Sequence, residues 1–100
     1  MSCAAPAGGV STDGVDLSGE SVIEGIVTRA GGASVGGAYV RLLDSSGEFT
    51  AEVPTNDAGE FRFFAAPGTW TVRTLAAGAS PVDRTVVAQQ GTVAEVQVAV

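Results

Sequence analysis

The sequence predicts a single all-β domain, a seven-stranded antiparallel β-sandwich, behind a flexible N-terminal arm. From Ser21 onward, seven short runs rich in β-branched and aromatic residues follow one another, separated by turn residues at fairly even spacing. No window of eleven residues has apolar side chains at a helical period. A chain of 100 residues has room for one domain. We therefore expect two stacked sheets and no substantial helix.

The first twenty residues differ in composition from the rest of the chain. Residues 1–20 are rich in Gly, Ala, Ser and Asp and show neither strand nor helix periodicity. Such composition is typical of a flexible segment. We predict an arm over residues 1–20 and a β-sandwich domain over residues 21–100.

Each expected strand alternates between an inward and an outward face. In the first strand Ile23, Gly25 and Val27 share one face, and in the last Val96 and Val98 share one. Faces that carry arginine or glutamate are expected to meet solvent. The expected strands are residues 21–29, 37–44, 48–54, 59–64, 69–76, 81–88 and 92–100.

Four of the six aromatic residues fall in the stretch FRFFAAPGTW, residues 61–70. We predict a hairpin with residues 65–68 as its loop, pairing Phe63 with Trp70 and Phe64 with Thr69. The same register places Glu60 opposite Arg73 on the other face. Phe61, Phe63 and Trp70 are then core residues, and Phe64 points outward beside Arg62.

The ionisable residues exclude several classes of function. The net charge is −6, and the five basic residues are arginines that never form a run, so we expect no nucleic-acid or membrane partner. The chain has no histidine and no lysine, which removes His-dependent nucleophiles, most zinc and iron sites, and Schiff-base chemistry. Thr55 to Glu60 (TNDAGE) lacks the spacing of a calcium loop and predicts a turn. We expect no catalytic residue, no metal and no cofactor.

The N-terminus and the cysteine content suggest a compartment. No positive charge precedes Arg29 and no apolar run reaches seven residues, so we expect no secretory signal. No segment approaches the length of a membrane span. Cys3 is the single cysteine, and an intramolecular disulfide is therefore impossible. A cytoplasmic protein is expected.

Two features remain as candidate sites. Cys3 lies in the arm beside no charged group, and is either an incidental thiol or a tethered carrier of sulfur. The second feature is a set of outward residues that, if contiguous, forms a partner surface, and otherwise consists of scattered surface side chains. Its members are Tyr39, Arg41, Leu43, Phe49, Arg62 and Phe64. Self-association through edge strands, giving a homo-oligomer, is a further alternative.

Four motifs resemble the carboxypeptidase regulatory-like domains. They are I-x-G-x-V (residues 23–27), G-A-x-V-x-L (37–42), TNDAGEFRF (55–63) and PGTWTV (67–72). These domains are transthyretin-like, or prealbumin-like, seven-stranded β-sandwiches. The resemblance covers residues 21–100 and implies the fold alone, because such modules serve many roles.

A narrower resemblance is carried by VGGAYVRLLDSSGEFTAEV (35–53) and FRFFAAPGTWT (61–71), following a cysteine near the N-terminus. These segments resemble an actinobacterial family of small uncharacterised proteins. That family is associated with sulfur metabolism because its genes lie beside those of rhodanese-type thiosulfate sulfurtransferases. The resemblance implies a thiosulfate sulfurtransferase as protein partner. It brings no catalytic residue with it.

Enzymes on related folds use residues that this chain lacks. The transthyretin-like hydrolases of purine breakdown use histidines and a C-terminal tyrosine–arginine motif, and this chain ends VQVAV. Intradiol dioxygenases bind iron through tyrosines and histidines, and Tyr39 is the single tyrosine here. The leading expectation is a non-enzymatic accessory protein that binds a sulfurtransferase through a face bearing Arg41, Arg62 and Phe64. The alternative is a sulfur carrier that accepts persulfide on Cys3.

Overall fold

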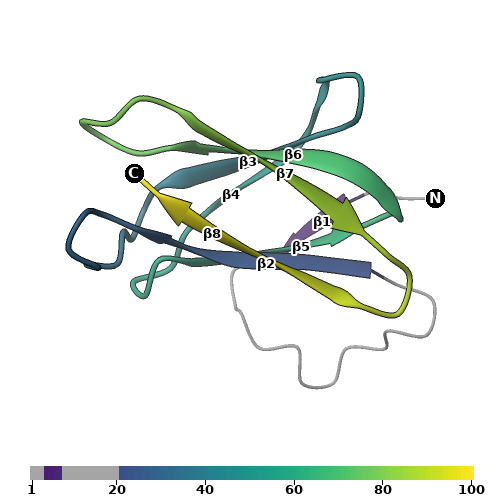
Figure 1. The fold of residues 1–100 in the computed structure, drawn as a ribbon, viewed down its shortest axis with the longest axis horizontal. Helices are drawn as coiled ribbons and strands as arrows, with labels where there is room; N and C mark the ends of the chain where they lie inside the picture. Colours follow the sequence, from purple (N-terminus) through teal and green to yellow (C-terminus); the bar gives the residue numbers. More distant parts are fainter. Residues whose placement is uncertain (1–3, 8–20) are drawn as a thin grey trace.

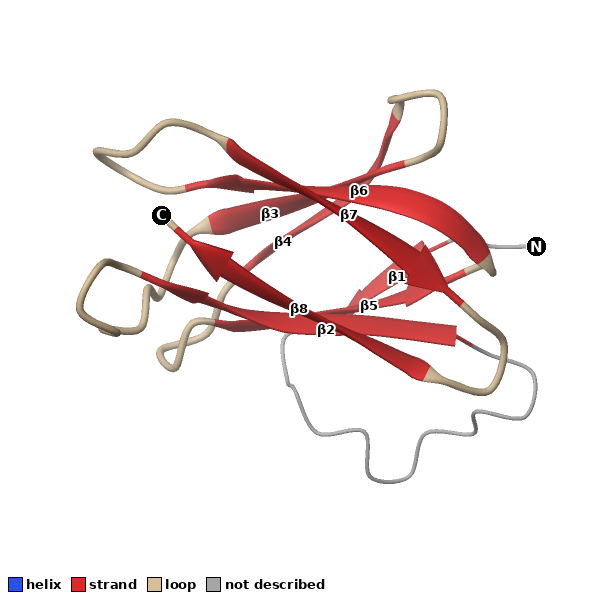
Figure 2. Ribbon diagram, in the orientation of Figure 1, coloured by secondary structure: helices blue, strands red, loops and turns tan. Residues whose placement is uncertain are grey.

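Two four-stranded sheets make up the computed structural model, which describes residues 4–7 and 21–100 (Figure 1). Sheet A has the order β1-β5-β2-β8, and sheet B has the order β4-β3-β6-β7. Strands and loops account for all of these described residues, without a helix (Figure 2). The strands are β1 (Ala4–Ala7), β2 (Ser21–Thr28), β3 (Tyr39–Leu43), β4 (Phe49–Pro54), β5 (Glu60–Ala65), β6 (Gly68–Leu75), β7 (Val82–Ala88) and β8 (Val93–Ala99). The predicted all-β sandwich is confirmed, and each of the seven predicted strands is present.

The eighth strand, β1, lies in the predicted arm. Ala4–Ala7 pairs antiparallel with β5, from Ala4 opposite Ala65 to Ala7 opposite Arg62. The expectation of a segment without strand structure is wrong for these four residues, because backbone pairing needs no apolar alternation. Pro6 is tolerated because β1 is an edge strand, where a missing N–H costs little. The rest of the predicted arm, residues 1–3 and 8–20, lies outside the described residues.

One strand pair departs from the predicted antiparallel arrangement. β2 and β8 run parallel, from Val22 opposite Val93 to Thr28 opposite Ala99. The chain crosses from β7 in sheet B to β8 in sheet A, and it enters sheet A in the same direction as β2. Alternation of side chains specifies the face of a strand but not its direction, so the sequence pattern does not reveal this pair.

The predicted hairpin between residues 59–64 and 69–76 is wrong. β5 pairs with β1 and β2, whereas β6 pairs with β3 and β7. Their short connection passes from one sheet to the other, so the predicted pairs Phe63–Trp70 and Glu60–Arg73 do not form. Trp70 instead donates an Nε1–H···O hydrogen bond of 2.9 Å to the carbonyl of Ala66 within this crossing.

The predicted core residues are nevertheless buried. Phe61 and Phe63 are fully buried and Trp70 is 6% exposed. The two phenylalanine rings have centroids 6.0 Å apart and planes tilted by 60°, an arrangement that aromatic pairs favour. Two facing sheets bury alternating apolar residues as well as one hairpin does. For this reason the burial prediction is confirmed although the pairing prediction is wrong.

Gly25 on β2 is required by the ring of Phe61. A Cβ at Gly25 would lie 2.6 Å from Phe61 Cζ and would also overlap the carbonyl oxygen of Val96 on β8. The absent side chain therefore lets an aromatic ring lie directly against the backbone of sheet A. The Phe61 ring therefore fills the space on the inner side of β2 that a side chain at position 25 would otherwise occupy.

The predicted turn at residues 56–59 is present. Asn56 Oδ1 accepts hydrogen bonds from the backbone N–H groups of Ala58 (3.0 Å) and Glu60 (2.9 Å). Gly59 has φ of 78°, which favours glycine. The turn directs the chain into β5 and so sets which β5 side chains face outward.

Candidate functional site

The outward side chains of sheet B form a surface that we call the B face. Pairing of β3 with β4 and β6, and of β6 with β7, aligns outward residues into rows across the four strands. The B face consists of Tyr39, Arg41, Leu43, Phe49, Glu52, Pro54, Thr69, Thr71, Arg73, Leu75, Asp83, Thr85 and Val87. It lies on the side of sheet B away from sheet A (Figure 1).

Large exposed apolar residues lie on the B face. Across residues 21–100, those most exposed are Tyr39 at 53%, Phe49 at 61% and Val87 at 54%. They come from three different strands, β3, β4 and β7. Exposed aromatic and aliphatic side chains that share one face are typical of a surface that another molecule covers.

A row of four charged residues crosses the centre of the B face. In the order of the strands, Glu52, Arg41, Arg73 and Asp83 are successive cross-strand neighbours. Arg41 Nε donates to Glu52 Oε2 at 2.7 Å. Arg73 donates to both carboxylate oxygens of Asp83, from Nε at 2.9 Å and from Nη2 at 3.0 Å. Two positive charges thus stand in the middle of the row and two negative charges at its ends.

The bidentate pair shifts the ionisation of both its members. The hydrogen bonds from Arg73 lower the pKa of Asp83 below its usual value. The same hydrogen bonds, together with the charge of Asp83, raise the pKa of Arg73. Both side chains are largely exposed, so the pair orients the guanidinium more than it stabilises the fold.

The outward side chains of sheet A form the A face. Three rows cross β5, β2 and β8, as given by the registers of these strands. The first row is Phe64, Val22 and Val93; the second is Arg62, Glu24 and Glu95; the third is Glu60, Ile26 and Gln97. Charge is concentrated in the second and third rows.

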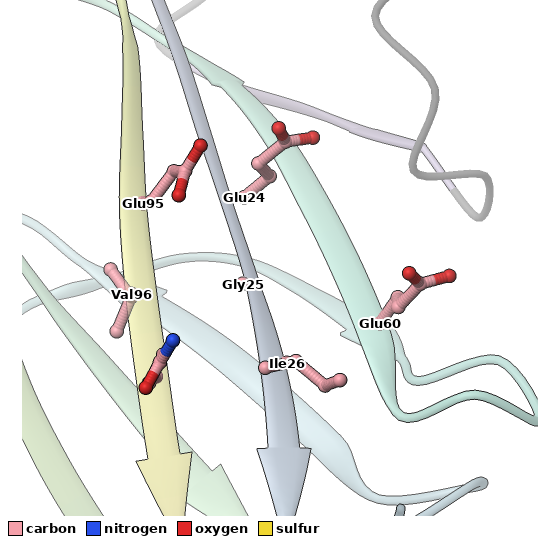
Figure 3. Close-up of a pocket in the computed structure, with 7 residues that line it drawn as sticks. Glu24, Gly25, Ile26, Glu60, Glu95 and Val96 are labelled. Atoms are coloured by element: carbon pink, nitrogen blue, oxygen red, sulfur yellow. The ribbon is translucent and has the colours of Figure 1, made fainter.

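A hollow of about 270 Å³ lies on the A face (Figure 3). It is lined by Glu24, Gly25, Ile26, Glu60, Glu95, Val96 and Gln97. Figure 3 shows the carboxylates of Glu24, Glu95 and Glu60 projecting from three neighbouring strands. Among the described residues, no group of three or more ligating side chains is placed to hold a metal ion.

Glu24 is the most perturbed acid of the A face. Burial raises its pKa, the nearby charges of Glu95 and Glu60 raise it further, and Arg62 opposes them. Glu24 Oε2 and the Nε and Nη1 atoms of Arg62 are buried and have no hydrogen-bond partner in the described part of the chain. Arg62 instead places its guanidinium carbon 5.2 Å from the centre of the Phe64 ring, a cation–π contact.

The structure separates the residues predicted to form one surface. Tyr39, Arg41, Leu43 and Phe49 belong to the B face. Arg62 and Phe64 belong to the A face, on the opposite side of the sandwich. The separation follows from the wrong hairpin, because strands assigned to two sheets cannot share an outer face.

Two further site predictions have different outcomes. Leu43 is only 5% exposed, so its expected place among the exposed apolar residues is wrong. It is packed among its neighbours on the B face and lies outside the central core cluster. Cys3 lies outside the described residues, so the sulfur-carrier hypothesis stays a prediction.

The sequence patterns did not single out Arg73, Asp83, Glu52 and Val87 as site residues. Alternation within each strand assigns an outward direction to a residue such as Arg73. The row becomes visible only when the register between strands is known, since Glu52 and Asp83 are distant from each other in the sequence. Spacing within a single strand carries no signal for such a row.

The comparison with protein families places the chain among uncharacterised proteins. A family model described as a protein of unknown function (DUF1416) matches residues 3–100. An uncharacterised protein of Mycolicibacterium smegmatis is 66% identical over 62 residues, covering 62% of this chain and 69% of that protein. The uncharacterised proteins Rv0814c and Rv3118 of Mycobacterium tuberculosis are each 57% identical over 76 residues, covering 75% of this chain and 76% of theirs.

Two solved structures with a similar fold are longer enzymes. Catechol 1,2-dioxygenase from Pseudomonas arvilla C-1 aligns with a TM-score of 0.55 at 13% identity, over 87% of this chain and 53% of that one. Chlorocatechol 1,2-dioxygenase from Pseudomonas putida aligns with a TM-score of 0.56 at 12% identity, over 86% and 61%. This chain therefore spans little more than half of either enzyme, and identities this low show a shared fold alone.

In the described part of the chain, no helix has the length and apolar character needed to cross a membrane.

Proposed function

The chain belongs to the DUF1416 family of proteins of unknown function, and for this member we propose a non-enzymatic role in which the B face binds a protein partner. One observation carries the proposal. The most exposed large apolar residues of the described chain, Tyr39, Phe49 and Val87, share the B face. Apolar side chains around a central charged row form the mixed surface found at protein interfaces.

The residue types of the chain support binding rather than catalysis. With neither histidine nor lysine, general acid–base work at neutral pH would fall to carboxylates, the single tyrosine or the Cys3 thiol. Tyr39 stands on the outer side of sheet B, and the carboxylates Glu24 and Glu95 line a shallow hollow that is open to solvent. The outer side of a sheet can bury a large area against a partner but does not by itself enclose a small substrate.

The first partner to test is a rhodanese-type thiosulfate sulfurtransferase. The support for this choice is the resemblance of residues 35–53 and 61–71 to proteins associated with such enzymes. With such a partner, the proposed role would belong to sulfur metabolism, in a protein that we propose is cytoplasmic. The B-face binding mode is independent of that choice, because it depends on the exposed residues and not on the resemblance.

Isothermal titration of the full chain with a purified actinobacterial thiosulfate sulfurtransferase tests the proposal. We expect saturable binding that weakens about tenfold or more in the double variant Tyr39→Ser/Phe49→Ser, because exposed aromatic residues contribute most at interfaces. The matched control Ile26→Ser/Val93→Ser changes two apolar residues of the A face and is expected to leave the affinity within about twofold.

Two outcomes would contradict different parts of the proposal. Absence of saturable binding to the sulfurtransferase removes the assignment to sulfur metabolism. Binding that weakens in the A-face control and not in the B-face variant removes the B face as the docking surface. Circular dichroism of each variant shows whether a loss of binding reflects a loss of folding.

A further inference from the structure

We propose that the B face recognises an acidic residue of its partner, an Asp or Glu flanked by apolar side chains, and that Arg41 receives the carboxylate beside Arg73. This inference rests on the proposed function, since it names the chemistry of the partner segment that docks on the B face. It follows from the hydrogen bonds that the central arginines leave unused, from the charge order of the row, and from the apolar residues on either side.

Arg41 and Arg73 are direct cross-strand neighbours on β3 and β6. Like charges directly opposite each other on a sheet oppose folding. The structure compensates at the edges, where Glu52 and Asp83 each hold one arginine. The centre of the row therefore keeps two adjacent positive charges although the whole chain carries −6.

The two arginines differ in how many donors they have left. Arg73 uses Nε and Nη2 for Asp83. Arg41 uses Nε alone for Glu52, so its Nη1 and Nη2 groups have no hydrogen-bond partner within residues 4–7 and 21–100. Its side chain is 44% exposed. These two N–H groups form the planar fork that matches both oxygens of a carboxylate.

Apolar residues lie on both sides of this fork. Tyr39 precedes Arg41 by two positions on the same outward side of β3, a separation of about 7 Å along a strand. On the other side, Phe49 of β4 pairs with Leu43 and is 61% exposed. A partner segment with apolar residues near its acid can cover Tyr39 and Phe49 while its carboxylate meets Arg41.

The order of charges opposes a second copy of the chain as the occupant. Two copies stacked face to face about a two-fold axis along the strands bring Arg41 over Arg73 and Glu52 over Asp83. An axis across the strands brings each of these residues over itself. Both centred arrangements oppose like charges at every position of the row, which is unfavourable across a buried interface. A different protein with an acid at this position has no such conflict.

Selection from a displayed library of random dodecapeptides tests the inference and does not require the partner to be identified first. The full chain serves as target, and the variant Arg41→Gln/Arg73→Gln is used for counter-selection. We expect enriched peptides to contain Asp or Glu within two positions of an apolar residue. Fluorescence anisotropy of the synthetic peptides then measures their affinities for the single variants.

The expected affinities separate the two arginines. Arg41→Gln is expected to weaken binding about tenfold or more, because it removes the fork that receives the carboxylate. Arg73→Gln has a smaller effect, since it removes a neighbouring charge only. Replacing the peptide's acid by its amide produces the same loss as Arg41→Gln and no additional loss in that variant. The control Arg84→Gln, at an exposed arginine of β7 outside the B face, leaves the affinity within about twofold.

Other outcomes would contradict either the inference about Arg41 or the proposed function of the B face. Enriched peptides without an acid, peptides whose binding ignores Arg41→Gln, or failure to enrich any peptide all contradict the inference. If binding is lost in Tyr39→Ser/Phe49→Ser but unchanged in Arg41→Gln, the proposed function stands and the inference falls. If binding is unchanged in both variants, both fall.

Discussion

Thr74 places a hydroxyl among apolar side chains of the core. It is fully buried on β6, and its Oγ1 has no hydrogen-bond partner among the described residues. A buried hydroxyl without a partner bears the full cost of its desolvation. Thr74→Val keeps the shape and removes the hydroxyl, so we expect the free energy of unfolding to rise by about 1–2 kcal/mol. Urea denaturation measures the change, and a lower stability in the variant would show that the hydroxyl makes a stabilising contact.

Gly25 offers a second test at the scale of one residue. The Cβ of Gly25→Ala would overlap the ring of Phe61 and the backbone carbonyl of Val96. Backbone cannot rotate away, so we expect a loss of about 2–3 kcal/mol in unfolding free energy. The control Gly47→Ala introduces a Cβ that meets nothing within 4 Å and carries only the backbone strain of φ 88°, about 1 kcal/mol. Equal losses in the two variants would contradict the close approach at Gly25.

The carboxyl group of Glu24 is expected to make the stability of the fold depend on pH. Its pKa is raised above 4.5 in the folded chain, first by burial and then by Glu95. A carboxyl group with a raised folded pKa is destabilising once it ionises, so the penalty is present above the folded pKa and absent well below 4.5. We expect Glu24→Gln to be more stable than the natural chain at pH 7, with the difference vanishing at a pH well below 4.5, about pH 3. Urea midpoints of both chains at the two pH values check this, and a difference independent of pH would contradict it.

At the scale of strands, Trp70 holds the crossing between the two sheets. Its indole N–H bonds to the carbonyl of Ala66, in the connection that leads from β5 to β6. Trp70→Phe keeps an aromatic ring in the core but removes that donor, and we expect a loss of about 1–3 kcal/mol. The more severe Trp70→Ala is expected to cost about 3–5 kcal/mol. Thermal denaturation ranks the two variants, and an unchanged stability of Trp70→Phe would show that ring burial alone matters.

The positions of strands β2 to β8 could be predicted from the sequence because turn residues punctuate it and apolar residues alternate. The partners of each strand could not. Phe61, Phe63 and Trp70 satisfy the same alternation whether β5 and β6 pair in one sheet or face each other across the core. β1 (AAPA) has no alternation in its sequence that would predict a strand, and its pairing with β5 is a long-range contact.

For the candidate site, too, the direction of a side chain could be predicted from its own strand, whereas its neighbours on other strands could not. The outward direction of Tyr39, Arg41 and Phe49 was predictable from their own strands. The charged row on the B face depends on register across four strands, and the separation of Arg62 from Arg41 depends on sheet membership. Both properties arise from contacts between distant segments, for which a single sequence carries little pattern.

At the scale of the whole molecule, β8 completes the sandwich. Val96 and Val98 belong to the core cluster, and β8 pairs with β2 along its length. We expect deletion of residues 92–100 to prevent folding, because it removes Val96 and Val98 from the core and leaves β2 as an edge strand paired with β5 alone. Dispersion of amide resonances in a proton–nitrogen NMR spectrum checks this, with the full chain as control. A well-dispersed spectrum of the shortened chain would contradict the requirement.

The pairing of β2 with β8 also constrains how the protein is made. β2 leaves the ribosome well before its parallel partner β8. At synthesis rates of about 5–20 residues per second, the interval between Thr28 and Val93 lasts on the order of 3–13 seconds. Throughout that interval one edge of β2 has no strand to pair with, so the nascent chain carries an open edge that neighbouring nascent chains or chaperones can reach. Sheet A is therefore completed only after β8 has emerged.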